Sequence, residues 1–282
     1  MNIGTIKEKK KFENRVSITP DEVKNYVKLG HQVVVEKNAG IQSGFSDKSY
    51  KEAGASISSA KDILNNSDIL LKINCPTLEE AKNLKTNSMI ISQIDVQNES
   101  NTIKIFNSKK ISAFSLERVP RITRAQDMDI LSSQANLAGY HAVIDAAQEF
   151  HRVLPLFMTA AGKVTPANVL VIGAGVAGLQ AIATAKRLGA IVFATDVRIA
   201  SKEQVESLGG KFVMVEDEES KNAETKGGYA KEMSIEYQKK QEALLAETLK
   251  EMDIVICTAQ IPGRKAPLIL KKEMLNNMKQ GS

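Results

Sequence analysis

Cysteine and histidine are scarce in this chain, and their scarcity excludes several kinds of site. The two cysteines, Cys75 and Cys257, lie far apart, so the sequence contains neither a disulfide framework nor a CxxC metal motif. None of the three histidines is paired with cysteines or carboxylates at ligand spacing, and we therefore expect no bound metal. The net charge of +5 comes from lysines scattered without stacking aromatic residues, which argues against a nucleic-acid partner.

Long apolar runs are also missing. The amino-terminal segment is polar and has no apolar core of the kind that a secretory signal peptide needs. The most apolar stretch, Val169 to Ala185, contains three glycines and is shorter than the ~20 residues that span a bilayer. We interpret it as a strand, a turn and a helix. The sequence thus predicts a cytoplasmic protein that does not insert into a membrane itself.

Strand-like and helix-like segments alternate along both halves of the 282-residue chain, which predicts parallel sheets covered by helices. A helix is expected after Thr19, because Thr19 can cap it, Pro20 suits its first position and Gly30 can end it. The fold class predicted is α/β, with two Rossmann-like, doubly wound parallel-sheet domains joined by a long helix. The expected boundaries are 1–125 for the first domain, 126–163 for the connecting helix and linker, and 164–282 for the second domain.

The connecting helix is predicted from Ala125 to about Phe150. Its apolar residues Ile130, Leu137 and Ile144 recur every seven residues, and we expect this stripe to face the core.

A glycine-rich turn in the second half carries the clearest chemical signal. The motif GxGxxG, formed by Gly173, Gly175 and Gly178, follows an apolar strand and opens a helix, whose free N–H groups suit phosphates. Asp196 ends the next strand, 18 residues after Gly178, close to the ~20 expected for an acid that accepts hydrogen bonds from a ribose. An aspartate there favours NAD over NADP. Arg198 could pair with a 2′-phosphate, but we expect an ordinary surface arginine.

Several longer segments carry a resemblance to a known family. These are PRITRAQDMDILSSQANLAGY (120–140), TDVRIASKEQVESLGGKF (195–212), GGYAKEM (227–233) and TAQIPGRKAP (258–267). Together they resemble the NAD(H)-binding component of proton-translocating NAD(P)+ transhydrogenase, which shares its fold with alanine dehydrogenase. Members of that family continue well past Ser282, so the resemblance implies that the chain is shortened at its carboxyl end and that its second domain is incomplete.

The resemblance implies a function and partners. A hydride would pass directly from NADH on this chain to NADP+ held by a partner, coupled to proton movement across a membrane. The expected partners are the NADP(H)-binding and transmembrane transhydrogenase subunits and a second copy of this chain, and the expected location is peripheral, on the inner membrane through those subunits. Alone, the chain should not be active.

The resemblance also implies roles for individual residues. Arg121, Asp129 and Ser132 would orient the nicotinamide carboxamide, and Gln126 would reach towards the partner's nucleotide. Ile122 and Thr123 would lie along the cofactor. The positions that would line the adenosine and pyrophosphate are Val176, Asp196, Val197 and Arg198. Gly228 and Tyr229 would belong to a mobile loop that closes over the bound nucleotide.

Two alternative functions remain. Alanine dehydrogenases use an arginine, a lysine and a histidine of the first domain; Arg15 and Lys72 match the first two, and Gln93 stands in place of the histidine. Without that acid–base group the amino-acid reaction has no proton carrier. An alternative interpretation is that Arg15 and Lys72 simply form salt bridges. The other alternative is a non-catalytic NAD-binding subunit.

Overall fold

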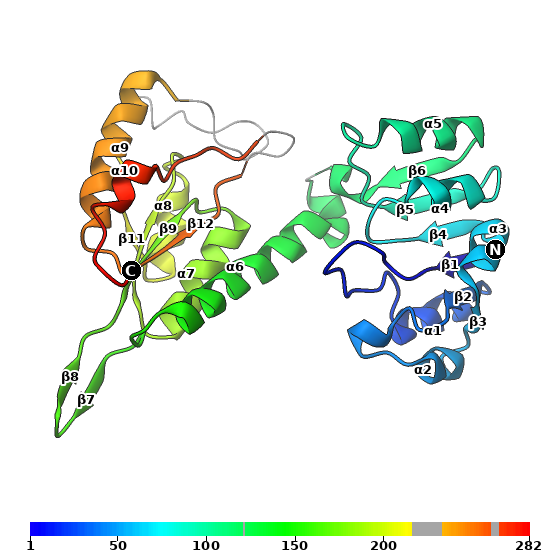
Figure 1. The fold of residues 1–282 in the computed structure, drawn as a ribbon, viewed down its shortest axis with the longest axis horizontal. Helices are drawn as coiled ribbons and strands as arrows, with labels where there is room; N and C mark the ends of the chain where they lie inside the picture. The colour runs from blue at the N-terminus through cyan, green and yellow to red at the C-terminus, as the bar shows by residue number, and fades with distance from the viewer. Residues whose placement is uncertain (121, 216–232, 261–264) are drawn as a thin grey trace. The chain divides into compact units, whose positions relative to one another are not determined.

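A computed structural model describes residues 1–120, 122–215, 233–260 and 265–282. The chain divides into two compact units, Met1–Ile130 and Leu131–Ser282 (Figure 1). Each unit contains a parallel sheet with helices on both faces, so the predicted fold class is confirmed.

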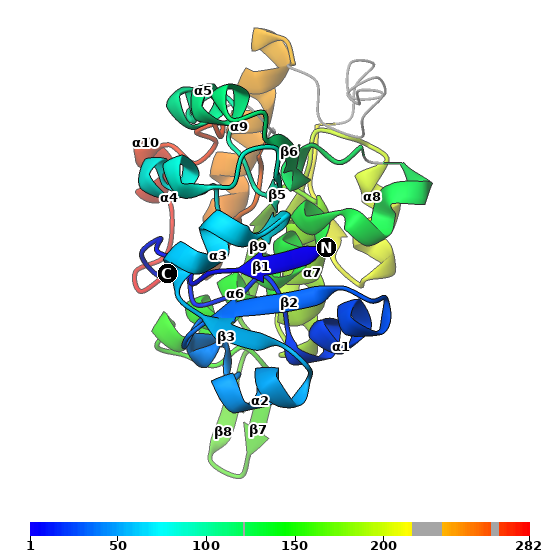
Figure 2. The ribbon, with the colours of Figure 1, turned by 90° about the vertical axis from the view of Figure 1, so that its right-hand side faces the viewer.

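The first unit is built around a six-stranded sheet. Its strands, in chain order, are β1 Asn2–Thr5, β2 Gln32–Glu36, β3 Ser56–Ser58, β4 Ile69–Leu71, β5 Met89–Ser92 and β6 Ser112–Ser115. Its helices are α1 Pro20–Lys28, η1 Ile41–Ser43, α2 Asp47–Glu52, α3 Ala60–Asn66, α4 Leu78–Asn83, α5 Ser100–Ser108, η2 Leu116–Arg118 and η3 Thr123–Met128. The strand order is β3-β2-β1-β4-β5-β6, with all neighbours parallel (Figures 1 and 2). This order reverses direction between β1 and β4, which is the usual position of a ligand crevice in such sheets.

Two apolar cores cover the two faces of this sheet. Residues of α1 and α2, including Val23 and Tyr50, pack with Val33 and Val35 of β2. On the other face, α3, α4 and α5 contribute a second core that includes Ile63 and Phe106. Side chains cap the starts of α1 to α4. The cap of α1 is as predicted, since the Thr19 hydroxyl accepts a hydrogen bond from the Glu22 amide.

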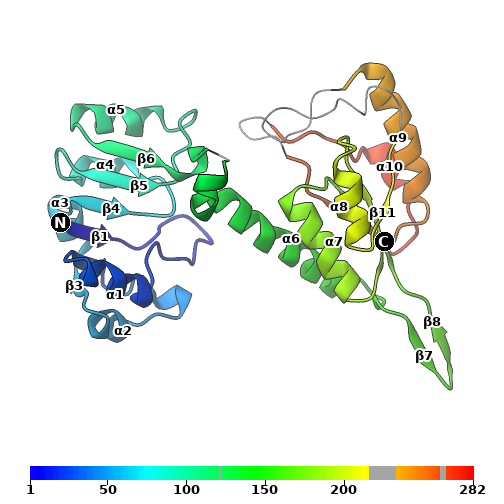
Figure 3. The same cartoon turned by 180° about the vertical axis from the view of Figure 1, so that it is seen from behind.

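The second unit contains a four-stranded parallel sheet. Its elements are α6 Ile130–Glu149, β7 Phe157–Thr159, β8 Gly162–Val164, β9 Asn168–Ile172, α7 Val176–Arg187, β10 Ile191–Thr195, α8 Ser201–Ser207, β11 Lys211–Phe212, α9 Ile235–Leu249, β12 Ile254–Cys257 and α10 Lys272–Leu275. The sheet order is β11-β10-β9-β12. Strand β7 pairs with β8 as a separate antiparallel hairpin (Figures 1 and 3).

Strand β9 is the centre of this unit, because its side chains alternate between two buried cores. Val169 and Val171 pack with α7 and α8 residues on one face, whereas Leu170 and Ile172 pack with Leu245 and neighbouring residues of α9 on the other. The apolar stretch that begins at Val169 is thus a buried strand, a turn and a helix, as predicted. Among the described residues no helix is both long and apolar enough to cross a bilayer.

The connecting helix differs from its prediction in start and in orientation. Residues 123–128 form the 3-10 helix η3, and α6 begins only at Ile130. The expected core stripe is wrong, since Leu137 is 54% exposed. The residues buried on α6 are Gly139 and Val143. A Cβ atom at Gly139 would overlap the carbonyl oxygen of Ala177, so the absence of a side chain allows α6 and α7 to approach closely.

Candidate nucleotide-binding site

The glycine-rich turn lies at the carboxyl end of β9. Gly173 has φ +97°, a conformation that L-residues with side chains rarely adopt, and its amide donates to the Thr195 carbonyl at 2.8 Å. Gly175 is the N-cap of α7 and provides no side-chain cap, so the first amides of this 12-residue helix are available to an external acceptor. The turn therefore presents the positive end of a helix dipole at the carboxyl ends of the sheet strands, as a phosphate site requires.

Gly175 and Gly178 differ in what surrounds them. A Cβ atom at Gly178 would overlap the carbonyl oxygen of Gly173 and lie 2.9 Å from Thr258 Oγ1. By contrast, a Cβ atom at Gly175 would have nothing within 4 Å. Gly178 thus allows α7 to pack on the end of β9, and Gly175 leaves open space beside the helix N-terminus.

Strand β12 supports the turn from its other side. The order β11-β10-β9-β12 reverses direction between β9 and β12, so the turn lies at the switch point of the sheet. Thr258, the first residue after β12, donates its amide to the Ile172 carbonyl at 2.8 Å and its hydroxyl to the Gly173 carbonyl at 2.8 Å. Thr258 is not among the predicted site residues, although its position directly after a strand next to β9 could have indicated it.

Asp196 lies at the end of β10, where its carboxylate faces the turn. It accepts a hydrogen bond from the Ala174 amide at 2.8 Å and forms an ion pair with Arg198 at 2.7 Å. Burial alone would raise the pKa of Asp196, but the Arg198 guanidinium and the two backbone amides outweigh it and hold the pKa below its usual value. The carboxylate is therefore charged at neutral pH. The expectation that Arg198 is an ordinary surface residue is wrong, because its side chain is only 16% exposed.

The other residues predicted around the adenosine are partly buried. Val176 begins α7, and Val197 packs beside Met233 and Tyr237. The end of β10 is further held by Gln241 of α9, whose amide donates to the Thr195 hydroxyl at 2.8 Å. Nothing in the local sequence pattern indicated Gln241, since it lies on α9, far along the chain.

The predicted nicotinamide residues lie around η3 and the start of α6. Ile122, Thr123 and Gln126 are exposed, whereas Asp129 and Ser132 are half-buried. Three further predicted residues, Arg121, Gly228 and Tyr229, lie outside the described residues. The residues up to Ile130 belong to the first compact unit, and the glycine turn belongs to the second.

The residues that would serve an alanine dehydrogenase are engaged with carboxylates. Arg15 is paired with Glu13 at 2.7 Å, and Lys72, whose side chain is 2% exposed, lies 3.4 Å from both Glu8 and Glu80. Both cations thus form salt bridges, as one interpretation of the sequence proposed. Gln93 is half-buried.

The pKa of the Glu13 carboxylate is shifted by its pairing with Arg15. Hydrogen bonds from the Arg15 guanidinium lower its pKa to about 2, and a hydrogen bond from the Asn74 side chain at 3.0 Å acts in the same direction.

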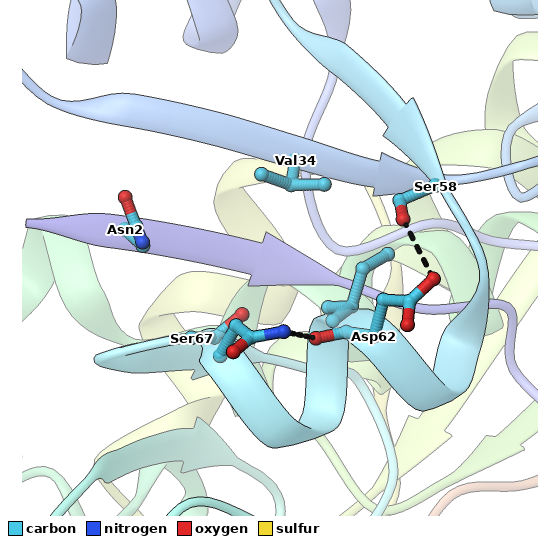
Figure 4. A pocket seen from close by; sticks show the side chains of 7 residues that line it. Asn2, Val34, Ser58, Asp62 and Ser67 are labelled. Carbon is cyan, nitrogen blue, oxygen red and sulfur yellow. Dashed lines mark hydrogen bonds between the residues drawn. The ribbon is translucent and has the colours of Figure 1, made fainter.

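A small cavity of about 150 Å³ lies elsewhere in the first unit (Figure 4). It is lined by Asn2, Val34, Ser58, Asp62, Ile63, Asn66 and Ser67. Its one charged side chain, Asp62, accepts a hydrogen bond from Ser58 at 3.3 Å (Figure 4). Asp62 also accepts one from Ser59, the N-cap of its own helix, at 2.6 Å, so its carboxylate is already hydrogen-bonded within the first unit. Within the described ranges, no cluster of three histidine, cysteine, aspartate or glutamate residues could hold a metal ion.

Two family descriptions match the chain. Alanine dehydrogenase/PNT, N-terminal domain, matches residues 4–138, and Alanine dehydrogenase/PNT, C-terminal domain, matches residues 142–282.

Individual relatives cover the whole chain. An NAD(P) transhydrogenase subunit alpha polypeptide of Rhodospirillum rubrum is 51% identical over 288 residues, which cover 100% of this chain and 75% of that protein. The NAD(P) transhydrogenase subunit alpha of Haemophilus influenzae is 46% identical, covering 100% and 54%. An alanine dehydrogenase of Methanococcus maripaludis is 28% identical, covering 100% and 70%.

Solved structures agree with the sequence relatives. The crystal structure of transhydrogenase from Sinorhizobium meliloti matches with a TM-score of 0.90 and 48% identity, covering 100% of this chain and 76% of that one. An L-alanine dehydrogenase structure matches with a TM-score of 0.82 and 25% identity, covering 100% and 72%.

Proposed function

The chain belongs to the alanine dehydrogenase/PNT family, and from that membership we propose that it is the NAD(H)-binding part of a proton-translocating transhydrogenase. A hydride passes directly between NADH on this chain and NADP+ on a partner subunit, and this transfer is coupled to proton movement across a membrane. The observation that supports the proposal is the open glycine turn at the β9 switch point with the charged Asp196 beside it.

Nucleotide choice follows from the charge of that carboxylate. Asp196 accepts hydrogen bonds from the two ribose hydroxyls of NAD, whereas a 2′-phosphate at the same position is repelled. The pyrophosphate binds at the N-terminus of α7, next to Gly175, where the amides are available and the space is open. Val176 and Val197 line the adenosine side of this site.

The residues around η3 bind the other end of the nucleotide. Hydride transfer between two nicotinamides needs no general acid or base, but it needs two rings in contact, correctly oriented and shielded from water. Arg121, Asp129 and Ser132 orient the carboxamide, and Gln126 acts towards the partner's nucleotide. Ile122 and Thr123 lie along the cofactor, and Gly228 and Tyr229 also belong to the nucleotide-binding residues.

Stopped-flow measurement of hydride transfer from NADH to an NADP+ analogue tests this function. The chain alone should bind NADH but transfer nothing, and transfer should begin when the NADP(H)-binding transhydrogenase subunit is added. Gln126→Asn should slow transfer on the order of 100-fold, since displacements of ~1 Å between reacting groups have effects of this size. Its affinity for NADH should remain nearly unchanged.

Asp127→Ser is the matched control for this experiment, because Asp127 is exposed on the same 3-10 helix and has no proposed role. It should leave the transfer rate within about twofold of the unmodified chain. Transfer by the chain without any partner, or equal rates for the two variants, would contradict the proposal.

An alanine dehydrogenase is the second candidate, and the first unit gives it little support. Its substrate would need a free cation for the carboxylate, whereas Arg15 and Lys72 are already paired with Glu13, Glu8 and Glu80. Alanine-dependent production of NADH by the chain alone would favour this candidate. A third candidate, a non-catalytic NAD-binding subunit, predicts NADH binding and no transfer even with the partner present.

The proposal includes partners and a location. The NADP(H)-binding and transmembrane subunits hold the chain at the inner membrane as a peripheral component. A second copy of the chain binds through the β7–β8 hairpin, in which Phe157, Met158 and Val164 are 49%, 75% and 44% exposed. A two-stranded hairpin is only marginally stable alone in water, so a partner surface over these apolar residues would stabilise it.

Sedimentation equilibrium tests the homodimer. Met158→Asp should convert dimers into monomers, whereas Lys163→Gln, at the paired position on β8, should leave the dimer intact. A monomeric unmodified chain, or a Met158→Asp variant that remains dimeric, would rule out this interface.

A further inference from the structure

The carboxylate of Asp196 has no acceptor position left for a ribose. Its Oδ1 accepts from the backbone amide of Arg198 and from Arg198 Nε, both at 2.9 Å. Its Oδ2 accepts from the Ala174 amide at 2.8 Å and from Arg198 Nη2 at 2.7 Å. An ionised carboxylate offers about four lone-pair sites, and these four bonds use them all.

Two of the four donors are movable and two are not. The amides of Ala174 and Arg198 belong to the glycine turn and to the segment that follows β10, so they stay with any side chain at position 198. The guanidinium is the end of a flexible side chain, and its paired N–H groups occupy the positions that two ribose hydroxyls would take. A ribose that binds Asp196 must therefore displace the guanidinium.

Because Arg198 is only two positions from Asp196, its displaced guanidinium remains close to the 2′-position of a bound ribose. Guanidinium groups bind phosphate through paired hydrogen bonds, and an arginine near this position is one way of accommodating a 2′-phosphate. The two side chains thus act in opposite directions on NADPH: Asp196 repels its 2′-phosphate and Arg198 attracts it.

We propose that Arg198 is a specificity-determining residue that holds the ribose acceptor of Asp196 in the empty site, is displaced when NADH binds, and limits how strongly the site rejects NADPH. This inference rests on the proposed nucleotide-binding function and deepens it. Loss of the guanidinium should not disturb the local fold, because the Ser201 amide donates to the backbone carbonyl of Arg198, and the two backbone bonds to Asp196 persist.

Fluorescence titration of NADH and NADPH on Arg198→Gln tests the proposal. NADH should bind about three- to tenfold more tightly because its competitor is gone, and NADPH should bind more weakly. The dissociation constant of NADPH divided by that of NADH should thus rise at least about threefold. Arg187→Gln, at the exposed end of α7, is the matched control and should leave the ratio unchanged. An unchanged ratio, or weaker NADH binding, in Arg198→Gln would overturn the proposal.

A double-mutant cycle separates competition from a merely structural role. In an Asp196→Asn background the charged acceptor is absent, so Arg198→Gln should no longer tighten NADH binding. An equal gain in both backgrounds would show that the guanidinium does not act through Asp196. Failure of the underlying function is distinguishable, because in that case the unmodified chain would bind neither nucleotide in the same titration.

Discussion

The two glycines that flank the start of α7 should respond differently to the same small change. Alanine at position 178 places a methyl group against the carbonyl oxygen of Gly173, which the central strand holds in place. Alanine at position 175 meets nothing within 4 Å and keeps a φ of −80°, which any residue adopts. Gly178→Ala should therefore damage the fold, and Gly175→Ala should damage only nucleotide binding.

The size of each effect follows from opposing terms. In Gly178→Ala, better helix propensity contributes about 1 kcal/mol, while overpacking against backbone costs about 1–3 kcal/mol or more. Because the overlap is with backbone atoms, the cost lies at the upper end of that range. The expected net loss is about 2 kcal/mol, or roughly 4–8 °C in melting temperature for a unit of this size. In Gly175→Ala, the lower entropy of the unfolded chain offsets the weaker N-cap, so stability should change by less than about 0.5 kcal/mol.

NADH affinity should rank the two variants in the opposite order from stability. The methyl group of Gly175→Ala occupies the space that the pyrophosphate needs in order to approach the backbone, and we expect NADH affinity to fall at least about tenfold. Thermal melting followed by circular dichroism measures the first effect, and NADH fluorescence titration measures the second. A Gly175→Ala variant that keeps full affinity, or that melts as low as Gly178→Ala, would refute the assignment of the two glycines.

Two further predictions concern the charged cluster of the first unit. Lys72→Met should destabilise the chain by about 3–5 kcal/mol in denaturant unfolding, since it leaves Glu8 buried without its cation and Glu80 with Lys9 alone; a loss below about 1 kcal/mol would contradict this. Glu13, with a pKa of about 2 against the usual 4.5, contributes stability that is present above pH 4.5 and is lost as the pH falls through 2. In Glu13→Gln, the free energy of unfolding should therefore fall by about 1–2 kcal/mol less between pH 5 and pH 2 than in the unmodified chain, a range that allows for the solvent exposure of Arg15. Equal pH dependence of the two proteins would show that solvent screens the pair.

The sequence predicted those elements whose signals are local. Thr19 and Pro20 marked the start of α1 because capping depends on neighbouring residues alone. The apolar run of β9 and the glycines after it identified the central strand and its turn for the same reason. Asp196 was found because the spacing between a glycine turn and the end of the next strand is fixed by one helix and one strand.

Elements with weak or non-local signals were missed. Strand β3 consists of Ser56, Ile57 and Ser58 at the sheet edge, too short and polar to show a period, and α3 follows it directly. The hairpin β7–β8 lies almost entirely within the segment predicted as linker. On α6 the apolar repeat indicated Leu137, but the packed face is set by Gly139, which has no side chain to mark it. Close backbone approach between helices leaves no hydrophobic signature in a sequence.

The same limit applies to the candidate site. The ion pair between Arg198 and Asp196 has no signature beyond two charged residues two positions apart, which are more often both solvated. The contributions of Gln241 and Thr258 depend on which helix and strand lie next to β10 and β9, and that is a property of the whole sheet. Residues that touch a site from distant parts of the chain become visible only when the topology is known.

The sheets of the two units have corresponding strand orders, but different residues occupy their switch points. In the first unit, Glu8 follows β1 and Lys72 follows β4, and these two side chains form a salt bridge at the crevice where such sheets bind ligands. In the second, the corresponding point between β9 and β12 carries a glycine turn with open space at Gly175. A small carboxylate substrate at the first switch point would have to break buried ion pairs. In the proposed function, a nucleotide at the second switch point would displace only one guanidinium from Asp196. The comparison of these costs supports the proposal that the chain holds one nucleotide and obtains its second reactant from a partner.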